Sequence, residues 1–74
     1  MIRSLDGKTP IIQPTAFVSE FAYVVGDVKI GEGSSVWPGT VIRADSGTIT
    51  IGQNTCIQDT SVVHGDADVV IGDG

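Results

Sequence analysis

The sequence predicts an all-β protein, folded as a parallel β-helix of hexapeptide repeats. A β-branched apolar residue recurs every six positions, and a small or medium-sized residue follows four positions after each of the first nine. A period of six fits neither the 3.6-residue turn of an α-helix nor the two-residue alternation of a meander, and it is typical of solenoids built from short coils. The apolar positions are Ile12, Val18, Val24, Ile30, Val36, Ile42, Ile51, Ile57, Val63 and Ile71.

Residues 1–11 lie outside the repeat. The Asp6-Gly7 pair is a turn signal, so this segment is predicted to form a short strand and turn that cap the N-terminal end. The repeat itself occupies residues 12–74, about three coils and the start of a fourth. Because no C-terminal cap is recognisable, we expect the β-helix to be incomplete, either the N-terminal part of a longer protein or a chain that self-assembles.

The stacking register follows from the period. Three hexapeptides make one triangular coil, so residues eighteen positions apart are predicted to lie above one another, with branched side chains stacking in parallel strands about 4.8 Å apart. Glycine follows the first inward column at positions 31, 52 and 72, which predicts a tight corner there. The inward columns are Ile12, Ile30, Ile51, Ile71; then Val18, Val36, Ile57; then Val24, Ile42, Val63.

Two insertions interrupt the repeat. Three extra residues follow Ile42 and two follow Val63. Both fall on the same edge of the triangle, so residues 46–49 and 66–69 are expected to protrude side by side as loops. Loops on one face of a solenoid usually carry its binding site.

The composition excludes several classes of partner. Nine acidic residues against four basic ones give a formal net charge of −5, whereas nucleic-acid binding requires a basic patch. No apolar run approaches the about 20 residues of a membrane-spanning helix, so no membrane partner is expected. The single cysteine cannot form an internal disulfide, and no signal-peptide pattern is present. These features predict a reduced, cytoplasmic location.

Chemistry-bearing residues gather at one edge. The second position of each hexapeptide points outward. The stacking places Arg43 and His64 in one outward column, and Trp37 and Gln58 in the neighbouring column. Asp45 lies on the same side as Arg43, and Asp59 follows Gln58 at the next corner. We therefore expect one edge to collect Arg43, Asp45, Gln58, Asp59 and His64.

His64, the only histidine, is either a surface side chain or a metal ligand through its neutral imidazole. One histidine cannot hold catalytic zinc, which takes three protein ligands, so the others must come from another subunit or further sequence. Arg43 can form a salt bridge with Asp45 or Asp59, which could also pin subunits together.

Three further outward residues have simpler interpretations. Gln58 is either solvated or hydrogen-bonded to a metal-bound water. Trp37, an exposed aromatic, is predicted to anchor an interface. Cys56 is expected to be a buried or half-buried small residue, because no basic neighbour in sequence activates its thiol.

Two segments carry a family resemblance. Residues 36–45 (VWPGTVIRAD) and 57–64 (IQDTSVVH) resemble the γ-class carbonic anhydrases and the related ferripyochelin-binding and phenylacetate-operon hexapeptide proteins. The pairing of Arg-x-Asp with Gln-Asp-x4-His is more specific than the hexapeptide repeat alone, which acyltransferases share. The resemblance implies a left-handed β-helix, against the usual right-handed crossover, assembled as a homotrimer.

The resemblance also implies roles for individual residues. His64 matches the first of three metal histidines supplied by two neighbouring chains, and Gln58 matches the catalytic residue that orients the metal-bound water or the substrate. Arg43 and Asp59 match an intersubunit ion pair, and Asp45 matches a neighbouring structural carboxylate. The implied enzyme hydrates carbon dioxide reversibly to bicarbonate by a metal-bound hydroxide at the trimer interface, with zinc, or alternatively iron or cobalt, as the cofactor.

The sequence departs from the family pattern in several places. The other two metal histidines have no counterpart in these 74 residues, so further sequence or other subunits must supply them. Ser46 stands where the best-studied type carries a proton-shuttling Glu, Ala67 stands where another Glu could lie, and Cys56 replaces a frequent Asn. These departures keep two alternatives open: a non-catalytic scaffold or binding member of the fold, and a hexapeptide acyltransferase with His64 as general base toward an acyl-CoA thioester.

Overall fold

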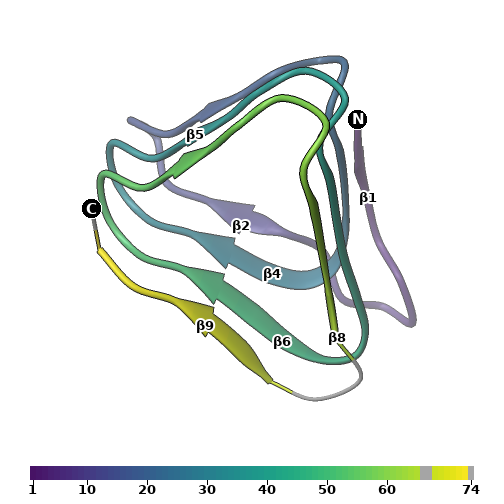
Figure 1. The fold of residues 1–74 in the computed structure, drawn as a ribbon. Helices are drawn as coiled ribbons and strands as arrows, with labels where there is room; N and C mark the ends of the chain where they lie inside the picture. Colours follow the sequence, from purple (N-terminus) through teal and green to yellow (C-terminus); the bar gives the residue numbers. More distant parts are fainter. Residues whose placement is uncertain (66–67, 74) are drawn as a thin grey trace.

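The computed structural model describes residues 1–65 and 68–73, and its regular structure is β-strand throughout that part of the chain. The strands wind into a triangular solenoid (Figure 1). Nothing within the described ranges forms a helix long and apolar enough to cross a membrane. The prediction of an all-β hexapeptide β-helix is confirmed.

The coil is left-handed. In Figure 1 the chain runs clockwise around the triangle, and successive coils approach the viewer because the N-terminal parts are the more distant, fainter ones. A clockwise path toward the viewer is a left-handed screw. Every pairing between the named strands is parallel, since each coil runs in the same direction as the coil below it.

The strands form the three sides of the triangle. Two long strands bend around one corner, so their first halves lie on one side of the triangle with β1 and β8 and their second halves lie on the next side with β2 and β9 (Figure 1). The third side consists of β3, β5 and β7. The strands are β1 (Ile2–Arg3), β2 (Ile11–Ile12), β3 (Phe17–Val18), β4 (Tyr23–Ile30), β5 (Ser35–Val36), β6 (Val41–Ile51), β7 (Cys56–Ile57), β8 (Val62–Gly65) and β9 (Val69–Ile71).

All three predicted inward columns are confirmed by the strand register. Ile30 pairs with Ile12 below it and with Ile51 above it, and Ile51 pairs in turn with Ile71. The other two columns follow in the same way, through Val36 and Ile42. The middle members are fully buried, as is Val24. Ile57 is also buried, while Ile12, Val18, Val63 and Ile71 are partly buried against this core.

The predicted loop at residues 46–49 is wrong at its last residue. Gly26 pairs with Ala44 and Val28 pairs with Ile49, so residues 45–48 lie opposite the single residue Asp27 at the bend of β4 and β6. Ile49 has no exposed surface, because the insertion ends one residue earlier and the next core position begins there.

The second insertion was predicted at residues 66–69, of which 66–67 lie outside the described residues. Val69 belongs to β9 and is partly buried. The expectation that the two insertions lie side by side is met at one contact, where the Thr48 amide donates to Asp68 Oδ1 at 3.0 Å.

Buried hydroxyls connect successive coils. Ser34, Thr40 and Thr55 lie among the small residues of the repeat and are 7% exposed or less. The Thr40 hydroxyl donates to the Gln58 carbonyl, and the Thr55 hydroxyl donates to the Gly72 carbonyl, both at 2.7 Å. The Ser34 hydroxyl donates likewise to the Gly52 carbonyl. In the described ranges no buried side-chain nitrogen or oxygen lacks a hydrogen-bond partner, so the hydrogen bonds between coils offset the cost of removing these hydroxyls from water.

The glycine column has a different physical reason from the predicted tight corner. Neither Gly31 nor Gly52 has a positive φ. A Cβ at Gly31 would instead lie 2.6 Å from the Gly52 carbonyl oxygen, which is backbone of the next coil. Glycine is therefore required by the close approach of stacked coils.

The N-terminal segment adds a strand and a turn to the first coil. Ile2 and Arg3 pair in parallel with the first half of β4. Asp6 and Gly7 have φ values of 52° and 78°, and Leu5 and Lys8 bridge across them, as in a two-residue turn with both central residues at positive φ.

We predict that Gly31→Ala lowers the free energy of unfolding by about 1–3 kcal/mol, because the new methyl group meets backbone that cannot move aside. Urea denaturation followed by circular dichroism measures the change. The matched control is Gly72→Ala, where a Cβ meets nothing within 4 Å, and its expected effect is within about 0.5 kcal/mol. Equal effects of the two substitutions would contradict the close-approach explanation.

Candidate metal-binding edge

One carboxylate joins the two predicted side chains of the outward column. Asp45 Oδ1 lies 3.1 Å from Arg43 Nε, and Asp45 Oδ2 lies 2.7 Å from His64 Nε2. The side chains of Arg43, Asp45 and His64 are 49%, 38% and 34% exposed. Solvent screens interactions at such exposure, so they contribute little to stability, and their effect is to orient the three side chains.

The strand register brings these residues together. Arg43 of β6 pairs with His64 of β8, and the next pair is Ala44 with Gly65. Side chains alternate between the faces of a strand, so Arg43, Asp45 and His64 all point outward while Ala44 is buried. Asp45 is the first residue of the bend, where the ladder with β8 has just ended, and from there its carboxylate reaches both neighbours.

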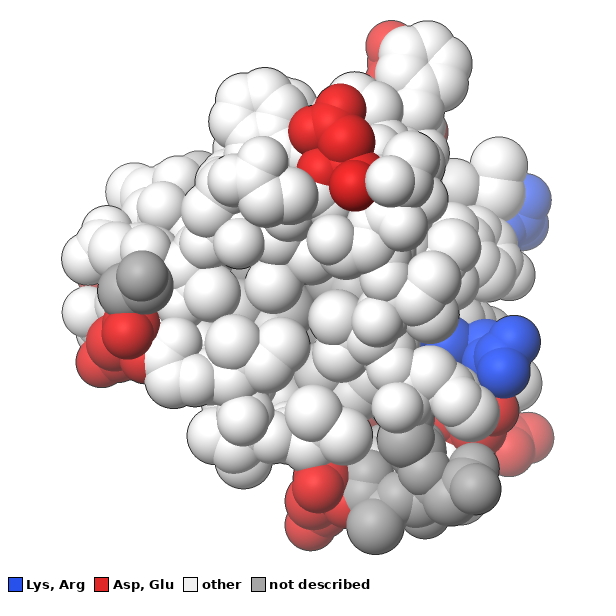
Figure 2. All heavy atoms as spheres, viewed as in Figure 1, with Lys and Arg blue, Asp and Glu red and all other residues white. Residues whose placement is uncertain are grey.

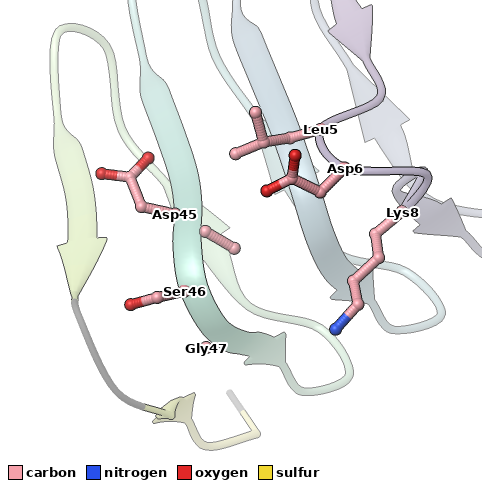
Figure 3. A pocket seen from close by; sticks show the side chains of 7 residues that line it. Leu5, Asp6, Lys8, Asp45, Ser46 and Gly47 are labelled. Atoms are coloured by element: carbon pink, nitrogen blue, oxygen red, sulfur yellow. The ribbon is translucent and has the colours of Figure 1, made fainter.

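A shallow hollow lies beside Asp45. Its volume is about 240 Å³. Figure 3 shows that the Asp45 carboxylate points away from Asp6 and Lys8, and so away from the N-terminal turn. Asp45 therefore borders the hollow and also belongs to the Arg43–Asp45–His64 group. Its lining residues are Leu5, Asp6, Lys8, Ala44, Asp45, Ser46 and Gly47.

Gln58 and Asp59 are not in contact with this group in the described part of the chain. Gln58 lies at the end of the β3–β5–β7 side, and its Nε2 donates to Cys56 Sγ at 3.3 Å. A corner with Thr60 at a φ of 60° separates it from β8. The expectation that one edge collects all five residues thus holds for Arg43, Asp45 and His64, while a corner separates the other two. Of the two carboxylates considered for Arg43, Asp45 is the partner within the chain.

Trp37 lies on the β3–β5–β7 side and is 40% exposed. Its ring packs at a tilt on Phe17, with the centroids 5.2 Å apart, and its Nε1 donates to Ser35 Oγ. Phe17 and Phe21 are also largely exposed. Figure 2 shows an end-on face that is uncharged in the middle, with acidic groups at several places on the rim and basic groups at its right edge.

The prediction that Cys56 is buried or half-buried is wrong, because the side chain is exposed. It lies directly before the inward residue Ile57 and pairs with Ser35 on the outer face. Side chains of a strand alternate between its two faces, so the residue directly before the inward Ile57 is expected to point outward from the sequence alone.

The described residues include no cluster of three or more histidine, cysteine, aspartate or glutamate side chains that could hold a metal ion. The single chain therefore offers one imidazole, that of His64, and catalytic zinc takes three protein ligands. Any further metal ligands would therefore have to come from outside the described residues.

The sequence reasoning missed the Asp45–His64 hydrogen bond and the hollow. The register already placed Arg43 opposite His64 and placed Asp45 on the same face, which was the signal for the bond. The hollow depends on how the N-terminal turn folds back beside β6 (Figure 3), and nothing in the hexapeptide period describes that turn.

Comparisons with known proteins agree with the hexapeptide solenoid and with the resemblance noted in the sequence. A family model described as bacterial transferase hexapeptide (six repeats) matches residues 9–44. Over 57 residues the chain is 53% identical to the mitochondrial γ-carbonic anhydrase 1 of Arabidopsis thaliana, covering 77% of this chain and 21% of that protein. These matches are consistent with a hexapeptide-repeat family that is similar to the γ-carbonic anhydrases. A carbonic anhydrase of Geobacillus kaustophilus is 45% identical over 64 residues, covering 86% of this chain and 35% of that one.

A solved structure agrees closely with the solenoid. The crystal structure of a hexapeptide transferase family protein from Anaplasma phagocytophilum matches with a TM-score of 0.93 and 43% identity, covering 97% of this chain and 43% of that chain. The chain spans about a fifth to a third of the length of the two curated relatives.

We predict that Cys56 reacts completely with a water-soluble disulfide reagent in the folded protein, because its side chain is exposed. The measurement is the absorbance of the released aromatic thiol, with the same protein in urea as the reference for full reaction. A thiol that reacts only after urea is added would contradict the outward placement of Cys56.

Proposed function

We propose that this protein is a γ-carbonic anhydrase-like metalloenzyme that hydrates carbon dioxide reversibly to bicarbonate, at a metal site shared between the chains of a homotrimer. The observation that carries the proposal is the exposed His64 on β8, the only histidine of the chain, held by Asp45 on an outward face. The similarity to proteins named as carbonic anhydrases supports it.

This edge supplies one of the three protein ligands that a catalytic zinc ion takes. His64 supplies an imidazole, which suits zinc, iron and cobalt alike, and zinc is the metal proposed. The remaining ligands come from outside the described residues, on a neighbouring chain or in further sequence. When bound, the ion supplies a lowered pKa for its water and thereby a nucleophile near neutral pH.

The residues of this chain position the reactants. The Gln58 carboxamide can both donate and accept hydrogen bonds, so it is suited to orient carbon dioxide or the attacking water. Arg43 and Asp59 are proposed to form an ion pair between neighbouring chains, and Trp37 is proposed to pack in the interface. In this assembly, the face of one chain that carries His64 adjoins the β3–β5–β7 side of the next chain, where Gln58 lies.

An acyltransferase function is the second candidate, and the descriptions of the matching family model and of a similar solved structure support it. The matching family model is described as a transferase, as is the similar solved structure. In an acyltransferase, His64 would act as general base, and its hydrogen bond to Asp45 would orient the ring for that role as well. The two functions differ in their need for a metal.

The cytoplasmic location also stays a prediction, since the name of one relative places that relative in mitochondria.

The test combines metal content with carbon dioxide hydration by stopped flow, using the full-length protein and two substitutions. His64→Ala is expected to abolish both zinc binding and hydration. Gln58→Ala is expected to keep the zinc and lower kcat/KM about 10–100-fold, the usual effect of losing a polar partner beside a metal site. Gln53→Ala, at another exposed glutamine, is the matched control and should change neither quantity.

Two outcomes would contradict the proposal. Zinc bound in full by His64→Ala would remove His64 from the metal site. Acyl transfer from an acyl-CoA without metal, lost in His64→Ala, would establish the transferase function instead.

A further inference from the structure

Thr60 has a backbone conformation that suits glycine better than threonine. It lies at the corner that leads into β8 (Figure 1), as the third residue of a turn that the Ser61 amide closes by donating to the Gln58 carbonyl at 3.3 Å. Its φ is 60°. A positive φ at this place of a turn calls for glycine or asparagine, and in a β-branched residue it is an outlier that stores backbone strain.

The stacking of the coils accompanies this conformation. The Thr60 amide donates to the Pro38 carbonyl of the coil below at 3.1 Å, and the amide of Gly39, which has a φ of 78°, donates to the first coil in the same way. At another corner Asn54 has a φ of 53°, and its amide donates to the Glu32 carbonyl of the coil below at 2.9 Å. At all three places an amide directed at the coil below thus goes with a positive φ.

The chain uses a residue that tolerates this conformation at the other two places, since glycine has no Cβ and asparagine enters it readily. Threonine stands only where the turn carries Gln58 and Asp59. The Thr60 hydroxyl donates to the Asp59 carbonyl at 2.6 Å, and its methyl group lies 3.2 Å from the place that a Cβ of Gly39 would take. The coil below therefore holds the amide of the Asp59–Thr60 peptide, and the hydroxyl holds its carbonyl.

We propose that Thr60 is a positioning residue for Gln58: it fixes the peptide group in the middle of their turn, and thereby the direction in which the exposed Gln58 side chain leaves the corner, at a cost in stability. This inference rests on the proposed function, in which Gln58 orients carbon dioxide or the attacking water. Backbone strain of this kind persists where the surrounding structure over-determines it, and it clusters at functional sites.

The first measurement is the stability of the full-length protein in urea. Thr60→Gly removes the strain, and this gain exceeds the extra entropy that glycine gives the unfolded chain, so the ratio of folded to unfolded protein is expected to rise about 2–5-fold. Protein concentration is held fixed, and native mass spectrometry checks that each variant assembles alike, because assembly adds to apparent stability.

Asn54→Gly is the matched control. Asn54 has the same sign of φ and the same kind of bond to the coil below, but asparagine already tolerates that conformation. The substitution therefore adds only entropy to the unfolded chain, and the ratio of folded to unfolded protein is expected to fall.

The second measurement is the order of the corner in the metal-free protein, from 15N relaxation of the backbone amides. In Thr60→Gly the order parameters of Gln58 and Asp59 are expected to fall from about 0.85 toward 0.6, because the hydroxyl no longer holds the peptide. Thr60→Ser keeps the hydroxyl and is expected to keep the order. Asn54→Gly is expected to leave this corner unchanged.

The third measurement is kcat for carbon dioxide hydration per bound zinc ion. Thr60→Gly is expected to lower it about 10-fold, because small misplacements of an orienting group are costly, and Thr60→Ser is expected to restore it. A merely structural role of Thr60 would change the amount of folded, zinc-loaded protein and leave kcat per zinc ion as it is. Asn54→Gly is expected to leave kcat unchanged.

Three results would overturn the inference: Thr60→Gly protein that is less stable than the unsubstituted protein, unchanged order at Gln58 in that variant, or unchanged kcat per zinc ion in that variant. If the unsubstituted protein does not hydrate carbon dioxide, the proposed function fails and the role of Thr60 in the reaction fails with it. The stability and relaxation measurements then still decide whether Thr60 fixes the corner.

Discussion

The structure depends on parallel stacking of each coil on the coil below it in a fixed register. Backbone hydrogen bonds set that register, and a column of β-branched side chains on each side of the triangle maintains it, because a shift by one residue would turn every inward side chain outward. Ile30, Ile42 and Val36 lie at the centres of the three columns and have almost no exposed surface. The same register determines that Arg43 lies opposite His64.

The bend of β4 and β6 explains how irregular chemistry arises in a regular fold. Residues 45–48 face a single residue of the coil below, so the repeat loses its period there and regains it at Ile49. Most positions of the repeat are restricted to residues that fit the core or the corners, which leaves few places for functional side chains. An insertion at a corner adds such places and leaves the inward columns unchanged. Asp45 is the first residue of this insertion, and its carboxylate joins Arg43 of the same strand to His64 of β8.

The hexapeptide period was sufficient to predict the columns, because Ile and Val at six-residue spacing satisfy one stacking geometry only. It was insufficient at Ile49, where the length of an insertion does not reveal which of its residues returns to the core. The period predicts a tight corner at Gly31, but the reason for this glycine is the close approach of the next coil, which only the distance between coils reveals. Cys56 was misplaced because the outward rule was applied to one position of the repeat and not to the position before it. The bond between Asp45 and His64 depends on side-chain rotamers, which no spacing specifies.

The central claim is the proposal that the metal site is shared between the chains of a homotrimer. The described residues of one chain offer a single imidazole and no cluster of three or more metal ligands. Native mass spectrometry of the full-length protein after zinc loading tests this proposal most directly. The account predicts an assembly of three chains carrying about one zinc ion per chain, with the zinc lost when the assembly is dissociated into single chains. A trimer without zinc, or single chains that retain it, would contradict the account.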